Sequence, residues 1–192
     1  GLVEREDGPW FALGEAAGPE PVLPVREWPL VGAPNRLNAL AALAVGRAAG
    51  LEPGAMAATL RAFRGLPHRM EAVGTVGGVR YVNDSKGTNV GAVASALEGL
   101  EGRWVWIAGG GNKGGDFVCL RPILEAGCRE AVLIGEAAEE IADAVADAVP
   151  VSRAGDMQAA VRRAAQVAGP GDSVVLSPGC TSFDHYPDFE AR

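Results

Sequence analysis

In the first third of the chain, apolar residues follow the pattern of short strands and then that of helices. Residues 10–13 and 22–31 are strand-like runs separated by Gly, Pro and Glu. From residue 35 the period becomes that of an α-helix. One face of this predicted helix carries Leu37, Leu40, Ala41, Ala44 and Ala48. Gly50 suits the end of the helix, and Pro53 suits the start of a second one.

The stretch Arg-Gly-Leu-Pro at residues 64–67 breaks the helical pattern. We therefore predict a domain boundary there, with one domain at residues 1–65 and a second at residues 66–192. The second domain begins with two β-rich runs on either side of Gly77-Gly78. Two such runs joined by a Gly-Gly pair are typical of a β-hairpin.

After the hairpin, apolar strands alternate with amphipathic helices. The predicted strands are 104–108, 131–134 and 173–176, and the predicted helices are 89–97, 117–126, 137–148 and 156–168. This alternation indicates βαβ units, in which a parallel sheet is covered by helices on both faces. The predicted fold class is therefore α/β with a mostly parallel sheet.

Polar loops follow three of the predicted strands. They are residues 83–89 (NDSKGTN), 109–116 (GGGNKGGD) and 177–184 (SPGCTSFD). Ligands of parallel α/β sheets bind beyond the carboxyl ends of the strands. The three loops therefore predict one site on one edge of the sheet.

The loop 83–89 places an acid, a cation and two hydroxyls just before a helix, and the start of a helix favours anions. Simpler interpretations remain open. Thr88 or Asn89 can cap the helix, and Asp84 and Lys86 can form a solvated surface pair.

The other two loops also allow two interpretations. Loop 109–116 is not a Walker A motif, because Lys113 is followed by Gly rather than Ser or Thr. It is either a flexible loop that presents one ammonium to a carboxylate or an ordinary glycine turn. In loop 177–184 we expect Cys180 to be a small buried residue rather than a nucleophile. Arg69, at the domain boundary, can reach a phosphate or stay a surface cation.

Composition and charge exclude several classes of protein. A net charge of −7 and a pI near 4.9 argue against a nucleic-acid binder. No apolar run approaches the roughly 20 residues that span a bilayer, so we expect no membrane association. The three cysteines form no CxxC pair, and no zinc-ligand spacing occurs. With no signal-peptide pattern, these features predict a cytoplasmic protein with reduced thiols and without a metal site, which we expect to be a monomer.

Taken together, five blocks of the sequence resemble the Mur ligase family. In order they are NRLNALAA (35–42), GLPHRME (65–71), NDSKGTN (83–89), GGGNKGGDF (109–117) and LSPGCTSFD (176–184), and residues 189–192 also fit. The NDSKGTN block resembles the branch that adds D-glutamate to UDP-N-acetylmuramoyl-L-alanine in peptidoglycan synthesis. Folylpolyglutamate-type ligases, other Mur-type ligases and a non-catalytic α/β module that binds a small anion are the alternatives.

The resemblance implies a three-domain, ATP-dependent enzyme that forms ADP. Residues 1–65 would end the central ATP-binding domain, and residues 66–192 would be the Rossmann-like C-terminal domain that receives the amino acid. The P-loop and the Mg²⁺ ligands of the family would lie upstream. We therefore expect this chain to be roughly half of such an enzyme and to be inactive alone.

The resemblance also implies roles for individual residues on the ATP side. Asn38 would contact adenine, Asp84 the ribose hydroxyls and Arg69 the phosphates. Pro34 stands where the family often has histidine, which weakens the link to adenine.

On the amino-acid side, the resemblance implies five further contacts. Thr88 and Lys113 would hold one carboxylate of D-glutamate, and Ser182 with the backbone near Phe189 would hold the other. Lys86 would be catalytic, because it would add positive charge near the reacting groups.

Overall fold

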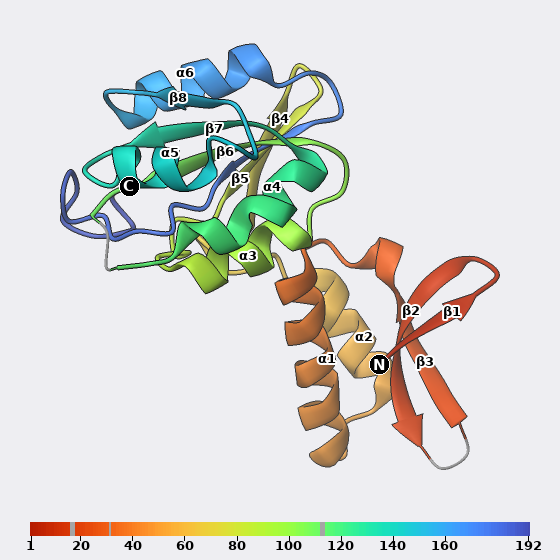
Figure 1. Ribbon diagram of the computed structural model, residues 1–192. Helices are drawn as coiled ribbons and strands as arrows, with labels where there is room; N and C mark the ends of the chain where they lie inside the picture. The colour runs from red at the N-terminus through yellow and green to blue at the C-terminus, as the bar shows by residue number, and fades with distance from the viewer. Residues whose placement is uncertain (16–17, 31, 112–113) are drawn as a thin grey trace. The chain divides into compact units, whose positions relative to one another are not determined.

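The computed structural model describes residues 1–15, 18–30, 32–111 and 114–192. These residues form two compact units, Gly1–Gly65 and Leu66–Arg192 (Figure 1). The first unit contains a small antiparallel sheet and two helices, and the second contains a six-stranded sheet with helices packed on it. Within the described ranges, no helix combines the length and the apolar character that crossing a bilayer requires.

The sheet of the first unit is a three-stranded antiparallel meander. Its strands are β1 (Leu2–Arg5), β2 (Gly8–Glu15) and β3 (Gly18–Pro24), paired in that order. The predicted strand 22–31 is wrong for residues 25–30, because the chain enters a 3₁₀ turn, Val25–Glu27, after Pro24; residue 31 lies outside the described residues. Proline has no N–H to donate to a neighbouring strand, so it favours the end of a ladder.

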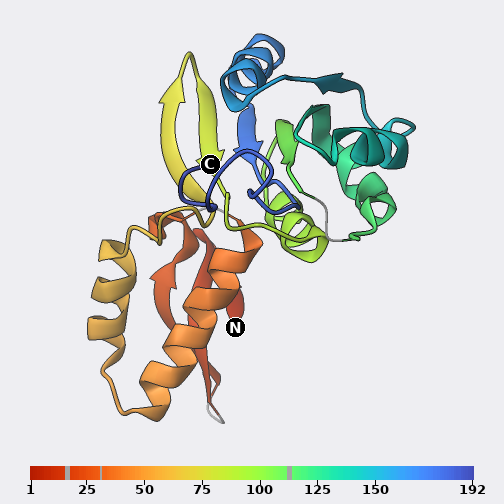
Figure 2. The same ribbon diagram turned by 90° about the vertical axis from the view of Figure 1, so that its left-hand side faces the viewer.

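Two helices lie on the same face of this sheet (Figures 1 and 2). They are α1 (Ala33–Ala48) and α2 (Pro53–Ala62), which confirms both predicted helices. The predicted apolar face of α1 is wrong, however. The buried residues are Ala39, Leu43 and Gly46, whereas Leu37 is 67 % exposed. α1 carries two apolar stripes. Helical spacing can identify a stripe, but the contacts with the sheet decide which of the two is buried.

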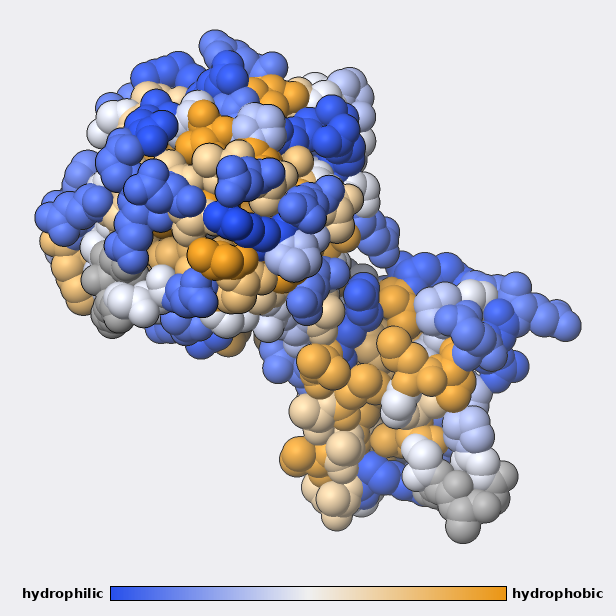
Figure 3. Space-filling model, viewed as in Figure 1, coloured by the Kyte–Doolittle hydropathy of each residue, from blue (hydrophilic) through white to orange (hydrophobic). Residues whose placement is uncertain are grey.

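The core of the first unit forms between the helices and the sheet. Phe11 and Trp28 meet edge to face, with 6.0 Å between the ring centroids. Leu43 of α1 and Leu60 of α2 belong to the same buried cluster. Outside this core, apolar residues gather over α1 and α2 on the face shown in Figure 3.

The second unit is built on a six-stranded sheet in the order β4-β5-β9-β6-β7-β8. The strands are β4 (Glu71–Val76), β5 (Val79–Asn83), β6 (Trp104–Gly109), β7 (Cys128–Ile134), β8 (Val151–Arg153) and β9 (Ser173–Leu176). β4 and β5 form the predicted hairpin, and all other pairs are parallel. The predicted mostly parallel α/β fold is confirmed. The edge strand β8 was not predicted, because it has three residues and none is fully buried.

Helices cover the sheet on both sides (Figure 1). They are α3 (Val90–Glu98), α4 (Arg121–Gly127), α5 (Ala138–Val145) and α6 (Met157–Val167). Ala160 and Ala164 of α6 pack against Val105 and Ile107. Since side chains alternate along a strand, Trp106 points to the opposite face.

One predicted helix, 117–126, is two elements in the structure. A 3₁₀ turn, Phe117–Leu120, precedes α4. Pro122 in the first turn of α4 has no N–H, so an α-helical bond back to residue 118 cannot form. The proline therefore sets the start of the α-helix.

Candidate functional site

The three polar loops follow β5, β6 and β9, which are neighbours in the sheet. Their backbones are bonded to one another. Gly179 N–H donates to the Gly87 carbonyl at 2.8 Å, and Gly109 N–H donates to the Pro178 carbonyl at 3.0 Å. The sheet therefore brings the three loops together on one edge, as expected for strands that run in parallel.

The glycines after β6 allow backbones to approach one another closely. Gly109 and Gly110 have φ values of 118° and 129°, which L-residues rarely adopt. A β-carbon at Gly110 would overlap the carbonyl oxygen of Thr181. Gly111 and Thr181 exchange two backbone hydrogen bonds, of 3.1 and 2.9 Å. This part of the loop is thus fixed against loop 177–184. Lys113, predicted to bind a carboxylate, lies outside the described residues.

A pocket of about 370 Å³ opens between loop 83–89 and the segment that follows β9. Its lining residues are Lys86, Thr88, Thr181, Ser182, Phe183, Asp188 and Phe189. The resemblance implied that three of them (Thr88, Ser182 and Phe189) bind the amino acid and that Lys86 is catalytic. The lining combines a cation, three hydroxyls, a carboxylate and two aromatic rings. Polar groups converging in a small concave space are typical of a site for a small molecule.

Lys86 is held at the wall of this pocket by an aromatic ring. Its Nζ lies 3.8 Å from the centroid of the Phe189 ring, which is a cation–π contact. Its backbone N–H donates to the His68 carbonyl at 3.1 Å. Within the described part of the chain, no carboxylate forms a salt bridge with Lys86. The ammonium can therefore neutralise a bound anion.

Asp84 is buried and fixes the start of loop 83–89. Its Oδ2 accepts a 2.8 Å hydrogen bond from the Ser177 hydroxyl, and its Oδ1 accepts a 3.2 Å bond from Met70 N–H. Burial raises the pKa of Asp84, and these hydrogen bonds and the nearby Arg69 partly oppose that rise. Asp84 is therefore not the solvated partner of Lys86 considered from the sequence.

Arg69 lies between two residues with left-handed backbone. His68 and Met70 have φ values of 60° and 46°. Such conformations are costly for non-glycine residues and persist where neighbouring contacts fix them. Here Asn83 Nδ2 donates a 3.1 Å hydrogen bond to His68 Nδ1, and the His68 ring meets Phe189 edge-on at 5.7 Å. Arg69 itself is exposed.

Loop 177–184 contributes hydroxyls and a turn. Ser182 is buried, and its carbonyl accepts hydrogen bonds from Tyr186 N–H at 2.8 Å and His185 N–H at 3.1 Å. This turn precedes Phe189, which lines the same pocket as Ser182. Cys180 is fully buried, and burial raises the pKa of its thiol to about 11. It is therefore a protonated packing residue, as predicted.

The helix cap predicted for this region is also present. Asn89 Oδ1 accepts a 2.9 Å bond from Ala92 N–H at the start of α3. Thr88, one residue earlier, lines the pocket instead. Of the two candidates for the cap, Asn89 therefore caps the helix, while Thr88 faces the pocket.

Sequence reasoning missed two residues that connect the loops, Ser85 and Arg192. The Ser85 hydroxyl donates to the Phe189 carbonyl at 2.7 Å, and Arg192 bonds to both loops. The bonds of Ser85 join residues that are 104 and 107 positions apart in the sequence. No local pattern could have indicated them.

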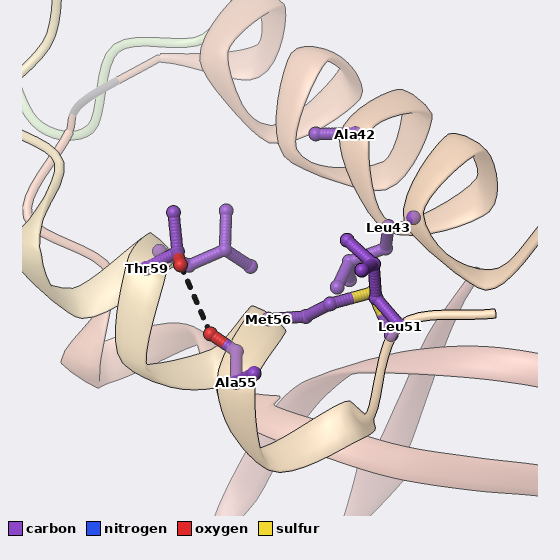
Figure 4. A pocket seen from close by; sticks show the side chains of 8 residues that line it. Ala42, Leu43, Leu51, Ala55, Met56 and Thr59 are labelled. Atoms are coloured by element: carbon purple, nitrogen blue, oxygen red, sulfur yellow. Dashed lines mark hydrogen bonds between the residues drawn. The ribbon is translucent and has the colours of Figure 1, made fainter. Parts of the chain in front are cut away.

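In the first unit, Asn38 is exposed on α1. A pocket of about 160 Å³ lies between α1 and α2 (Figure 4). Its lining residues are Ala42, Leu43, Gly46, Leu51, Ala55, Met56, Thr59 and Leu60. The Thr59 hydroxyl donates to the Ala55 carbonyl of its own helix at 2.9 Å. This pocket is therefore apolar and does not include Asn38.

Among the described residues, no group of three or more His, Cys, Asp and Glu side chains is arranged to hold a metal ion. The described residues therefore offer no such cluster for Mg²⁺, whose ligands, by the resemblance, would lie upstream.

Comparison with known proteins decides the family. Residues 68–180 match the family model described as "Mur ligase, glutamate ligase domain". This match covers more than half of the chain. The chain belongs to the Mur ligase family. Five of the predicted site residues lie in the matched segment: Arg69, Asp84, Lys86, Thr88 and Lys113.

Curated relatives of this Mur ligase chain match over nearly all of its length. A protein of Pseudomonas fluorescens is 47 % identical over 99 % of the chain, and one of Pseudomonas savastanoi pv. phaseolicola is 50 % identical over 100 %. Both are named UDP-N-acetylmuramoylalanine–D-glutamate ligase. The chain spans 43 % of the length of each.

Solved structures share the fold. MurF ligase from Thermotoga maritima, in complex with ADP, matches with a TM-score of 0.65 at 17 % identity, covering 92 % of this Mur ligase chain and 41 % of that one. Mycobacterium tuberculosis folylpolyglutamate synthase, complexed with ADP, gives 0.62 at 20 % identity over 93 % of this chain and 44 % of that one. At these identities the likeness establishes the fold alone.

Proposed function

We propose that this chain is part of an ATP-dependent ligase that adds D-glutamate to UDP-N-acetylmuramoyl-L-alanine and forms ADP and phosphate. The observation that carries the proposal is the pocket lined by Lys86, Thr88 and Ser182, in a chain whose 47–50 % identical relatives are named D-glutamate ligases. The family match favours a ligase over a non-catalytic anion-binding module.

D-Glutamate has two carboxylates, and the pocket has donors on two walls. Thr88 comes from loop 83–89, and Ser182 comes from the loop after β9. We propose that Thr88 and Lys113 hold one carboxylate and that Ser182 and the backbone near Phe189 hold the other. Hydrogen bonds from charged donors to carboxylates are short and strong, which suits a dianionic substrate. Gly111, in the same loop, is bonded to Thr181 in the pocket lining.

Lys86 is proposed to act on the reacting groups. ATP first phosphorylates the alanine carboxylate of the UDP-sugar substrate. The amine of D-glutamate then attacks the acyl carbon, loses a proton and displaces phosphate through a tetrahedral intermediate. Negative charge gathers at this centre, and a preorganised ammonium stabilises it. The contact with Phe189 fixes the Lys86 ammonium without neutralising it.

The ATP contacts are proposals of the same kind. Arg69 would bind phosphates, and its exposure between two fixed residues supports that role. Asp84 would accept from the ribose hydroxyls through lone pairs that remain beside its two internal hydrogen bonds. Asn38 would contact adenine.

A chimera tests this proposal. The chain would replace the matching 43 % of the Pseudomonas fluorescens relative. With ATP and UDP-N-acetylmuramoyl-L-alanine, we expect ADP release that depends on D-glutamate, with the amide product seen by mass spectrometry. Use of L-glutamate or of a diamino acid in place of D-glutamate would instead indicate a folylpolyglutamate-type or another Mur-type ligase. A folded chimera without any ligase activity would contradict the proposal. The 192-residue chain alone should release no ADP.

A further inference from the structure

Arg192 connects the two loops that form the walls of the pocket. Its Nη2 donates to the Ser85 carbonyl at 2.8 Å, and its Nε donates to the Ser85 hydroxyl at 3.1 Å. Its Nη1 donates to the carbonyls of Cys180 and Thr181, at 3.2 and 3.1 Å. Ser85 precedes Lys86 in the chain, and Thr181 precedes Ser182. One guanidinium thus holds the backbone next to both walls.

Ser85 extends this connection to the aromatic wall. It is fully buried, and its hydroxyl donates to the Phe189 carbonyl at 2.7 Å. Phe189 in turn carries the Lys86 ammonium on its ring. The loop before α3, the loop after β9 and the segment around Phe189 are therefore linked through Arg192 and Ser85.

The bonds of Arg192 all go to neutral acceptors. In the described part of the chain no carboxylate forms a salt bridge with this guanidinium. Burial lowers the pKa of Arg192, yet a guanidinium stays charged in proteins. Arg192 is partly buried, and taking a charge out of water costs free energy unless hydrogen bonds compensate for it. Arginine offers a rigid planar fork of donors, and the single ammonium of lysine cannot reproduce it.

We propose that Arg192 is a positioning residue that sets the spacing of the Lys86–Thr88 and Thr181–Ser182 walls and thereby the affinity of the pocket for its amino-acid substrate. The identity of that substrate rests on the proposed function, whereas the positioning rests on the hydrogen bonds alone. Two experiments distinguish the positioning role of Arg192 from the identity of the substrate.

The first experiment needs no activity. Amide hydrogen exchange is measured on the 192-residue chain and on its Arg192→Ala and Arg192→Lys variants. We expect the amides of Gly87 and Gly179, which lie in the two linked loops, to exchange about tenfold or more faster in Arg192→Ala, because local opening becomes easier. Arg192→Lys should be intermediate. The amides of α6 should not change.

Arg162→Ala is the matched control, because Arg162 is exposed on α6 and does not line the pocket. It should leave the exchange of both loops unchanged. Unchanged exchange at Gly87 and Gly179 in Arg192→Ala would overturn the positioning role. If Arg192→Ala fails to fold, Arg192→Lys and Ser85→Ala decide instead, since each removes only part of the same connection. In that case both variants must show faster exchange of the Gly87 and Gly179 amides.

The second experiment uses the chimera. In Arg192→Ala we expect KM for D-glutamate to rise about tenfold or more while KM for ATP stays within about threefold, because amino-acid binding groups are misplaced. Arg192→Lys should recover part of this loss. A purely structural role would lower the melting temperature and the active fraction and leave KM for D-glutamate unchanged, and that result would overturn the proposal. If the unsubstituted chimera does not use D-glutamate, the proposed function fails, and hydrogen exchange still decides the positioning.

Discussion

Replacing Ser177 with alanine should destabilise the second unit of the chain by about 2 kcal/mol. Ser177 is fully buried, and its hydroxyl donates a 2.8 Å hydrogen bond to Asp84, which is 7 % exposed. The alanine variant keeps the backbone bonds of residue 177 and the Met70 bond to Asp84, so the substitution removes one interaction. It therefore measures how strongly Asp84 is held at the start of loop 83–89.

The magnitude follows from the charge of the acceptor. A hydrogen bond to a charged group contributes about 1.5–3 kcal/mol, more than a bond between neutral groups. The loss of one hydroxyl oxygen leaves almost no cavity, so no large packing cost is added. Asp84 would keep one of its two side-chain hydrogen bonds and remain buried. We place the cost near the middle of the range, at about 2 kcal/mol.

The pH dependence has a definite sign. Burial raises the pKa of Asp84 above its ordinary value of 3.8. Such a group contributes stability that is fully present below the unfolded pKa and is lost as the pH rises through the folded pKa. Removing the Ser177 donor raises the pKa of Asp84 in the folded state further. As the pH rises, the variant therefore loses more stability than the parent chain. The deficit of Ser177→Ala should therefore be larger at pH 7 than at pH 4.

Urea unfolding followed through Trp106 measures this deficit. The indole N–H of Trp106 donates to the Ser177 carbonyl at 2.7 Å and reports on the second unit by its own NMR signal. Ser95→Ala, at an exposed position of α3, is the control and should change stability by less than about 0.5 kcal/mol. A deficit for Ser177→Ala no larger than that of the control at pH 7, or one that grows toward pH 4, would refute the reasoning.

Three further predictions concern the loops and the sheet. In the chimera, Lys113→Ala should weaken D-glutamate use by about 1–3 kcal/mol for a lost charged hydrogen bond, and an unchanged KM for D-glutamate would count against its role. Gly110→Ala should destabilise the second unit by about 3 kcal/mol in urea unfolding, because its φ of 129° and a neighbouring carbonyl leave no room for a methyl group. The control is Gly155→Ala, at a position in open space, which should leave the free energy of unfolding nearly unchanged. Burial alone would raise the pKa of Glu130, but hydrogen bonds from Arg163 and Ser152 and the charge of Arg163 together outweigh it and lower that pKa. The stability that Glu130 contributes is thus present above its ordinary pKa of 4.5 and lost as the pH falls below it, so a Glu130→Gln deficit that persists at pH 3 in thermal unfolding would contradict this.

Much of the second unit was determined by its sequence. A parallel strand buried on both faces must be apolar throughout, and all six residues of β6 are buried. The neighbouring helices need one apolar face, and α6 buries Ala160 and Ala164. These are local requirements, so periodicity reveals them. Since parallel strands end at one edge, the sequence also predicted that the three polar loops meet.

The sequence did not determine features that depend on which elements pack against each other in the folded chain. The stripe of α1 around Leu37 looked like a core face, but the sheet of the first unit covers the stripe around Leu43 instead. The predicted strand 22–31 ends early, because β3 stops at Pro24. The proline is visible in the sequence, but the apolar residues around it suggested that the strand continued. Apolar character shows that a residue can be buried and does not show which neighbour buries it.

For the candidate site, the sequence supplied the polar residue types and the tertiary structure supplied their pairing. Lys86, Thr88 and Ser182 could be chosen from their loops, and the structure places them in one pocket. The carboxylate of Asp84 and the guanidinium of Arg192 find their partners across gaps of 93 and 107 positions. Only the register of the sheet brings such distant groups within hydrogen-bonding distance, because each bond depends on where whole strands end.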